Sequence, residues 1–283
     1  MRRKIKTSLA TKFALTITGL IFFTLLVVSV AIYRTIVTQF TAQYQKNVRT
    51  AEHMVRSALW NQKRAILEQL RGVTYKLSED DDFVIYTGVL KQYNNKYITD
   101  YAAAFLPTMG LEILEIIRKD GRMISSGHSP DKWRGQHTRM AQFYKHTRNT
   151  VLIGQFDGPR GSDYCLLAMD STRLQTQQLY VMGGVAIDSG FLQDMLPDTS
   201  ILAFLLLPHQ VIASTSKWQA PEVLKDVSLK MDPEQLKKEL VSDYSVGGFD
   251  IPMINESGII PVHVLLLHPK TALNELLSSL SKR

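Results

Sequence analysis

The sequence predicts an α+β protein that one N-terminal helix anchors in a membrane. An uncharged apolar stretch lies close to the N-terminus, and a long segment with helical periodicity follows it. Beyond Pro107 the pattern changes to short β-branched or aromatic runs that are separated by turn residues. Strands that follow a long helical segment are typical of an antiparallel sheet with helices on its faces, the α+β class.

The apolar stretch, Phe13 to Tyr33, contains 21 residues and no charge. As a helix it would be about 31 Å long, enough to cross the hydrocarbon core of a bilayer. A cleaved signal peptide is the alternative, because small residues occur at 29–31, but the stretch is longer than an ordinary signal core and an uncleaved anchor is favoured. Five basic residues precede the stretch and only Arg34 directly follows it, which predicts a cytoplasmic tail at 1–12 and an extracytoplasmic (periplasmic) position for 34–283. The sequence thus predicts a single-pass protein of the plasma (inner) membrane.

The same basic tail explains most of the net charge of the chain. The net charge is +7, and the five basic residues before Phe13 contribute +5 of it, which leaves +2 for the rest. No later Lys/Arg run or aromatic spacing is typical of a nucleic-acid-binding module. We therefore expect no nucleic-acid partner.

Residues 34–77 predict a long helix outside the membrane, because apolar residues recur there in steps of three and four. Its apolar stripe needs a partner, either the domain that follows or the same helix of a second subunit, so we expect a homodimer. The acidic residues 78–82 predict a solvated cap, and Phe83 to Phe105 predicts a further helix that Pro107 stops.

Five strands are predicted between residues 111 and 187, and the first two are joined by a tight Asp-Gly turn at Asp120. A short helix capped by Asp188 or Ser189 ends this set. The strand-turn-strand pattern then starts again at Ile201 and ends in a terminal helix, which indicates an internal duplication with a smaller second copy. We predict a first module at 78–196 and a second at 197–283.

A family resemblance rests on three features: the basic N-terminus with one membrane helix, the hairpin "KDGRMISSG" (119–127), and the ending "GGVAIDSGFLQDML" (183–196). Together they resemble the double Cache-type, PAS-like sensor regions of bacterial membrane receptors, and residues 118–136 are similar to the extracytoplasmic part of certain sensor histidine kinases. The resemblance implies a first module that holds a small molecule between its sheet and covering loops. It also implies a signal that passes along the long helix and a second membrane helix to a cytoplasmic output domain.

The chain departs from that pattern in its C-terminal part. It stops at "LLSSLSKR", where a second membrane helix is expected, and it contains neither a phosphoacceptor histidine box nor paired glycine-rich ATP motifs. A fragment, a split gene and an independent single-pass sensor subunit with a cytoplasmic or membrane signalling partner all stay open.

The residues predict no catalytic centre and no cofactor. Hydrolase, P-loop, metalloprotease and dithiol motifs do not occur in the sequence. His128, His137 and His146 are spaced by nine residues, which fits no compact metal motif. The single cysteine, Cys165, is predicted to be a small buried residue, and the paired glycines at 183–184 are predicted to permit close packing.

A ligand site is the stronger functional prediction, and we place it in the segment between the second and third strands. Aromatic walls with one or two convergent charges suit a small anionic or zwitterionic ligand, because arginine can hold a carboxylate with two hydrogen bonds. The structural alternative is that these residues only cover the sheet. The candidate residues are Trp133, Arg134, Arg139 and Tyr144, with Asp157 and Asp188 as complementary acids for an amine, and His128 to Arg134 at the mouth of the segment.

The leading functional hypothesis is a non-enzymatic, membrane-anchored extracytoplasmic sensor domain of a signal-transduction receptor that binds a small molecule. The alternatives are an anchored periplasmic binding or assembly module without a signalling role, and an anchored enzyme of unrecognised type.

Overall fold

The computed structural model describes residues 9–132, 135–136, 144, 147, 150–158, 161–175, 177–196, 198–208, 210–215, 233–255 and 258–281. These residues form two compact units. The first comprises Met1–Asn47 and Lys270–Arg283, and the second comprises Val48–Pro269.

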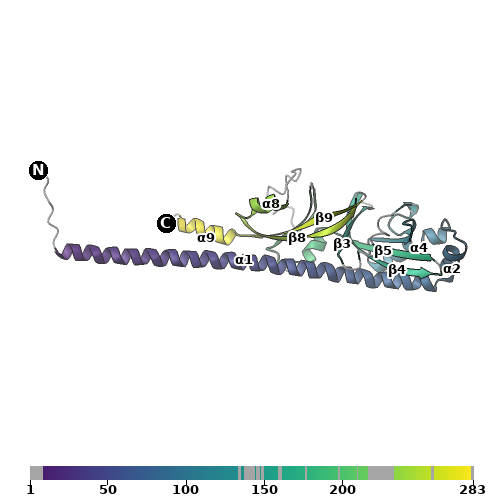
Figure 1. The fold of residues 1–283 in the computed structure, drawn as a ribbon, viewed down its shortest axis with the longest axis horizontal. Helices are drawn as coiled ribbons and strands as arrows, with labels where there is room; N and C mark the ends of the chain where they lie inside the picture. The colour runs from purple at the N-terminus through teal and green to yellow at the C-terminus, as the bar shows by residue number, and fades with distance from the viewer. Residues whose placement is uncertain are drawn as a thin grey trace. The chain divides into compact units, whose positions relative to one another are not determined.

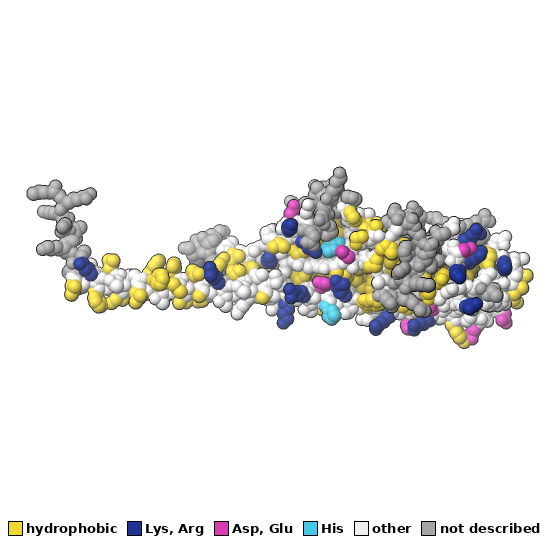
Figure 2. All heavy atoms as spheres, in the orientation of Figure 1, with side chains coloured by type: hydrophobic (Ala, Val, Ile, Leu, Met, Phe, Trp, Pro, Cys, Tyr) yellow, Lys and Arg dark blue, Asp and Glu magenta, His cyan; other side chains and the backbone are white. Residues whose placement is uncertain are grey.

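Helix α1, Leu9–Glu79, includes both the predicted membrane segment and the predicted long helix without a break (Figure 1). Continuity is expected because its 71 residues contain no proline. Its apolar N-terminal part exposes large side chains (Figure 2), and among the described residues it is the one helix long and apolar enough to cross a membrane. Threonine hydroxyls in this part, such as those of Thr16 and Thr24, donate to the carbonyl oxygen four residues earlier, which satisfies them within the helix. The first unit also contains α9, Thr271–Ser281, the predicted terminal helix.

In the second unit, the apolar stripe of α1 packs on one face of a β-sheet. The buried stripe residues recur at the predicted three- and four-residue steps and share one core cluster with strand residues such as Leu114, Ile116 and Val181. The partner of the stripe in this region is therefore the chain's own sheet. The homodimer stays a prediction. The buried stripe consists of Val48, Ala51, Val55, Leu59, Ile66, Leu70, Val73 and Leu77.

The acidic run after α1 is a cap, as predicted. The Asp80 carboxylate accepts a hydrogen bond from the Phe83 backbone N–H (2.9 Å) at the start of α2, Asp81–Val84. It also accepts from the hydroxyls of Tyr97 (2.5 Å) and Tyr101 (3.0 Å), and burial together with this carboxylate raises the pKa of Tyr97 to about 12.

The prediction of one helix from Phe83 to Phe105 is wrong. The chain instead forms α2, a π-helical turn η1 (Ile85–Val89), α3 (Lys96–Thr99) and α4 (Tyr101–Met109). Lys91 adopts a positive φ of 54°, which ends the first part, and the Asn95 side chain caps α3. Pro107 does not stop the helix but lies inside α4, where a short helix loses little when one backbone donor is removed near its end. The helix is instead capped by Gly110, whose φ is 62°.

The strands of the described part of the chain form one nine-stranded sheet in the order β2-β1-β5-β4-β3-β8-β9-β6-β7. Neighbouring strands are antiparallel except β3 and β8, which pair in parallel over two residue pairs. The α+β prediction is therefore confirmed. The strands are β1 (Ile113–Arg118), β2 (Met123–Ser126), β3 (Leu152–Gly158), β4 (Gly161–Leu174), β5 (Gln177–Ala186), β6 (Leu202–Leu207), β7 (Gln210–Ser214), β8 (Tyr244–Asn255) and β9 (Gly258–Pro269), and three short helices accompany them: η2 (Pro130–Lys132), α6 (Ser189–Asp194) and α8 (Pro233–Leu240).

The strand order supports the predicted duplication. We call β1 to β5 the first half-sheet and β6 to β9 the second half-sheet. Their orders, β2-β1-β5-β4-β3 and β7-β6-β9-β8, are the same except that no described strand of the second half-sheet corresponds to β3. Both opening hairpins also shift register at the same place, between Ile116 and Ile117 in β1 and between Leu205 and Leu206 in β6. The division into modules at 196/197 stays a prediction.

Two local predictions about turns and glycines are confirmed. Gly121 has φ of 85°, and the Asp120 carboxylate accepts from the Arg122 N–H (3.2 Å) and lies 3.0 Å from Arg118 Nη2, so this polar cluster is hairpin geometry. A Cβ atom on Gly183 would lie 2.8 Å from Leu70 Cδ2, so the absence of a side chain lets α1 approach β5 closely.

Candidate functional site

The first half-sheet has two different faces. Alternate residues of β1 show the division: Leu114 and Ile116 belong to the core cluster with α1, whereas Ile113 and Ile117 belong to a separate apolar cluster. We call the second face, opposite α1, the connection face, because the segment between β2 and β3 contributes to it. This segment, residues 127–151, is called the β2–β3 connection. The apolar cluster on the connection face contains Ile113, Ile117, Tyr144, Leu152, Phe156, Cys165, Leu167, Met169, Tyr180, Met182 and Ile254.

Glu115 lies in the middle of this apolar face. Its position in β1 falls between Ile113 and Ile117, and its side chain is only 2% exposed. His128 Nε2 lies 3.6 Å from Glu115 Oε1, and the His128 side chain is 8% exposed. A carboxylate taken out of water costs free energy unless polar or charged groups accompany it, so this acid–imidazole pair is the chemically distinctive feature of the face.

The end of β2 positions His128. Ser126 is the partner of Glu115 in the β1–β2 ladder, and its hydroxyl accepts from the Ser129 N–H (3.2 Å) and lies 3.4 Å from His128 Nδ1. The imidazole ring is perpendicular to the ring of Phe156 of β3, with an interplanar angle of 89° and ring centroids 6.0 Å apart. Both ring nitrogens of His128 thus face polar groups of β1 and β2, while the ring lies beside Phe156 of β3.

Tyr144 places a second part of the β2–β3 connection on the same face. Its ring packs against Tyr180 of β5, with centroids 4.7 Å apart, and its hydroxyl lies 2.8 Å from Ser171 Oγ of β4. Among the described residues of the connection, His128 near its start and Tyr144 in its second half therefore reach the connection face.

Cys165 of β4 lies on the same face, and burial raises the pKa of its thiol to about 12. At neutral pH the group is therefore a protonated thiol, and the prediction of a small buried residue is confirmed. Among the residues that the structure describes, no group of three or more His, Cys, Asp or Glu side chains could hold a metal ion.

The structure describes half of the predicted site residues. Trp133, Arg134 and Arg139 lie outside the described residues. Tyr144 lies on the connection face, as above. The backbone of Asp157 pairs with Ser162 in the β3–β4 ladder, but its side chain is outside the described part. Asp188 is exposed and caps α6 by accepting from the Phe191 N–H (2.8 Å), which confirms the predicted cap.

Glu115 was missed by sequence reasoning, although a signal was present. It is a charged residue in the apolar run "LEILEII", at the same parity as Ile113 and Ile117, in a strand that is buried on both faces. An acid at such a position is an exception to the alternation rule and marks a buried polar site.

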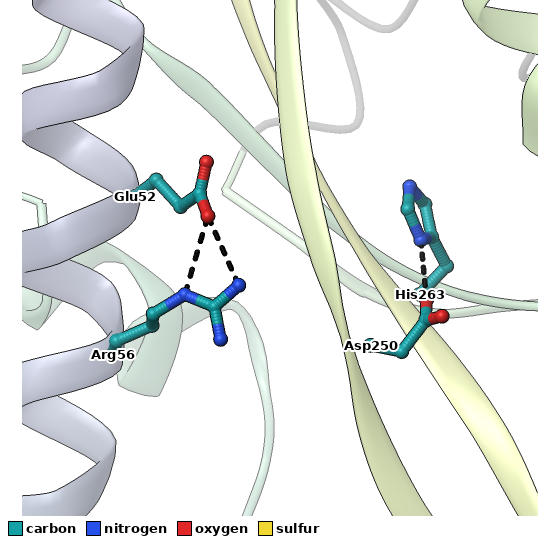
Figure 3. A network of polar contacts seen from close by, with 4 residues as sticks. All are labelled: Glu52, Arg56, Asp250 and His263. Atoms are coloured by element: carbon teal, nitrogen blue, oxygen red, sulfur yellow. Dashed lines mark hydrogen bonds and ion pairs between the residues drawn. The ribbon is translucent and has the colours of Figure 1, made fainter.

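The second half-sheet carries a comparable pair on its equivalent face. His263 of β9 and Asp250 of β8 are direct partners in the ladder, and His263 Nδ1 lies 2.7 Å from Asp250 Oδ1 (Figure 3). The neighbouring residue Phe249 faces α1 instead, where the Arg56 guanidinium lies 3.8 Å above its ring and is held by Glu52 (Figure 3). The His263 side chain is 9% exposed and that of Asp250 is 64% exposed.

Comparison with known proteins gives matches among solved structures only. No sequence-family model matches the chain, and no curated protein matches it. The periplasmic domain of Vibrio cholerae LuxQ is similar at 11% identity, over 78% of this chain and 99% of that domain, with a TM-score of 0.46. The sensor domain of the V. cholerae histidine kinase DctB (12% identity, 81% of this chain and 99% of that domain, TM-score 0.41) is similar as well. So is the sensory domain of the Campylobacter jejuni chemoreceptor Tlp3 with isoleucine bound (11% identity, 86% and 97%, TM-score 0.47).

These similar structures are extracytoplasmic sensor domains of histidine kinases and a chemoreceptor, the group that the Cache-type resemblance named. Their identities to this chain are 11–12% and their TM-scores are below 0.5, so the likeness is one of fold alone.

Proposed function

We propose that this chain is a membrane-anchored extracytoplasmic sensor domain of a signal-transduction receptor, and that it binds a small molecule on the connection face. The observation that carries the proposal is the buried pair that Glu115 of β1 forms with His128 of the β2–β3 connection. A buried acid on an otherwise apolar face adds little to stability, so a binding role accounts for it best. The opposite face of the same sheet packs on α1, so a change on one face has a short path to the helix.

The proposed ligand is a small zwitterion. A simple anion would be repelled by a buried carboxylate, whereas an ammonium group would find in Glu115 an acceptor that is shielded from water. For the anionic end we propose Arg134 and Arg139, with Trp133 as an apolar wall, because arginine binds carboxylates through paired hydrogen bonds. Asp157 and Asp188 are secondary proposals for the amine, and Asp188 already serves as a helix cap.

The proposed topology places residues 1–12 in the cytoplasm, 13–33 in the membrane and the rest outside it. The apolar part of α1 and the basic residues before it support this orientation. A cytoplasmic or membrane partner would receive the signal.

A ligand screen on the full chain in lipid nanodiscs tests the proposal. Thermal unfolding is followed with panels of small zwitterions, carboxylates and amines. A ligand at a hundred times its Kd stabilises a protein by about 2.7 kcal/mol, which corresponds to a rise of roughly 5–10 °C for a domain of this size. We expect a zwitterion to give this shift, and we expect Glu115→Gln, Arg139→Ala and Trp133→Ala to remove it.

Asp250→Asn is the matched control, because it removes a carboxylate beside an imidazole on the equivalent face of the second half-sheet. It should leave the shift unchanged. A ligand whose stabilisation survives Glu115→Gln, Arg139→Ala and Trp133→Ala would contradict the proposed site.

The second candidate function is an anchored binding or assembly module without signalling. Amide hydrogen exchange of α1 between Val48 and Glu79 separates the two functions. A sensor should change exchange in this part of α1 when ligand binds, and unchanged exchange at saturating ligand would favour the second candidate.

A further inference from the structure

Lys63 is a charged residue at a buried position of α1. Its side chain is 1% exposed and lies between the stripe residues Leu59 and Ile66, where the helical pattern calls for an apolar residue. Its ammonium group donates to the backbone carbonyl oxygens of Thr147 and Thr150, and it lies 4.8 Å from the centre of the Trp60 ring. Thr147 and Thr150 belong to the β2–β3 connection, so α1 holds a segment whose Tyr144 packs on the opposite face of the sheet.

Thr147 and Tyr144 lie on one turn of that segment. The Thr147 hydroxyl donates to the Tyr144 carbonyl oxygen at 2.8 Å, three residues earlier. Tyr144 in turn contacts Ser171 and Tyr180 on the connection face. A chain of direct contacts thus runs from the connection face through Tyr144, Thr147 and the Lys63 ammonium to α1.

The free-energy cost of burying a charged amine at position 63 indicates that Lys63 does more than fill space. Burial lowers the pKa of its amine from 10.5 to about 8, so the charged form is held at a cost. An apolar side chain of similar length would fill the same space without that cost. What the ammonium adds is a directional contact with two carbonyl oxygens of the connection.

We infer that Lys63 is the positioning residue that couples the β2–β3 connection to α1: its ammonium holds Thr147, and through Thr147 it holds Tyr144 against the connection face, so that displacement of Tyr144 by a ligand moves α1. The inference rests on the proposed function for its ligand, but the tie between Lys63 and the connection can be tested without one. Removing the ammonium should let the connection open more often while the sheet stays folded.

Cys165 provides the probe, because it is the single cysteine of the chain and lies buried on the connection face. The rate at which a fluorescent maleimide labels Cys165 is measured on the full chain in nanodiscs, in the absence of ligand and at several low urea concentrations. We expect Lys63→Met to label at least about tenfold faster than the wild type, which corresponds to about 1.4 kcal/mol of easier opening. Labelling through local opening should depend weakly on urea, whereas labelling through global unfolding depends on it steeply.

Two further variants complete the test. Lys76→Met removes an amine from the same helix, where Lys76 lies over the Phe105 ring of α4, and its labelling rate should stay within about twofold of the wild type. Lys63→Arg keeps a cation with several donors and should return the rate to within about threefold of the wild type.

The inference is overturned if Lys63→Met labels at the wild-type rate, or if Lys63→Met and Lys63→Arg both accelerate labelling with the steep urea dependence of global unfolding. Neither result would bear on whether a ligand binds at Glu115, so failure of the coupling and failure of the proposed function can be told apart.

Discussion

Both half-sheets pack one apolar face against α1, but they differ on the face that points away from α1. In the first half-sheet the carboxylate of Glu115 is the buried member of the acid–imidazole pair, and its partner His128 comes from the β2–β3 connection. In the second half-sheet the imidazole of His263 is buried, the carboxylate of Asp250 is exposed, and the two residues face each other across a strand ladder.

This difference separates a contact that can be changed from one that is fixed. The register of β8 and β9 holds Asp250 opposite His263 wherever the loops lie, because ladder partners cannot separate without breaking backbone hydrogen bonds. The contact between Glu115 and His128 depends on where the connection lies. We therefore expect ligand-dependent change on the first half-sheet and a constant scaffold on the second, and four predictions test that comparison.

The largest effect is expected from the packing of α1 on the sheet. Leu70 is fully buried against Gly183 of the first half-sheet, and Leu70→Ala should lower the free energy of unfolding by about 3 kcal/mol. Val48 packs against Gly247 of the second half-sheet, and Val48→Ala removes less volume and should cost about 2 kcal/mol. Urea unfolding measures both. Equal losses under 1 kcal/mol would show that the helix is not anchored by these contacts.

A pH dependence of the unfolding free energy in the alkaline range is expected from Lys63 of α1. Because the pKa of Lys63 is about 8 in the folded state and 10.5 in the unfolded chain, the unfolded chain binds the additional proton between these values, and stability should rise as pH increases from 8 to 10.5. We expect a rise of about 2 kcal/mol, since the two carbonyl acceptors offset part of the desolvation.

The difference in unfolding free energy between the wild type and Lys63→Met is measured across this pH range. It separates the contribution of Lys63 from that of tyrosines with a raised pKa, such as Tyr97. Arg56→Met removes a cation of α1 that lies over Phe249 of the second half-sheet, and it should leave the pH dependence intact. If the difference in unfolding free energy between the wild type and Lys63→Met does not change with pH, Lys63 is not the source of the pH dependence.

Tyr144→Phe tests the connection directly. It removes the hydrogen bond to Ser171 without changing the ring that packs on Tyr180, and should lower the free energy of unfolding by about 1 kcal/mol. Maleimide labelling of Cys165 should become a few times faster. If labelling stays at the wild-type rate while stability falls, the hydroxyl stabilises the sheet without holding the connection.

The smallest effect is expected at Asp250. Because its carboxylate is mostly exposed, Asp250→Asn should lower the free energy of unfolding by only about 0.5 kcal/mol. It should not change Cys165 labelling, since ladder register holds this pair. Faster labelling in Asp250→Asn would show that the two half-sheets open together and would remove the distinction drawn above.

Sequence reasoning determined the parts of the fold that depend on local pattern. The apolar stripe of α1, the nine strands, the Asp120–Gly121 turn and the Asp188 cap follow from periodicity and turn chemistry, which act over a few residues. Even the duplication was visible in the repeated strand-turn-strand pattern. The prediction failed between Leu90 and Asn95, where composition favours helix but a positive φ at Lys91 and the Asn95 cap break it.

Tertiary structure alone decided which polar residues come together. Glu115 and His128 are separated along the chain by a hairpin, and Lys63 is separated from Thr147 by 84 residues, so no local pattern could pair them. The sequence alone does not say which face of each strand packs against α1. The β1–β2 register and the close approach of α1 at Gly183 decide it. The sequence thus determines that a long helix, a duplicated sheet and a covering connection exist. Their packing decides that a buried acid lies on one face and that a buried lysine on the other side holds the connection.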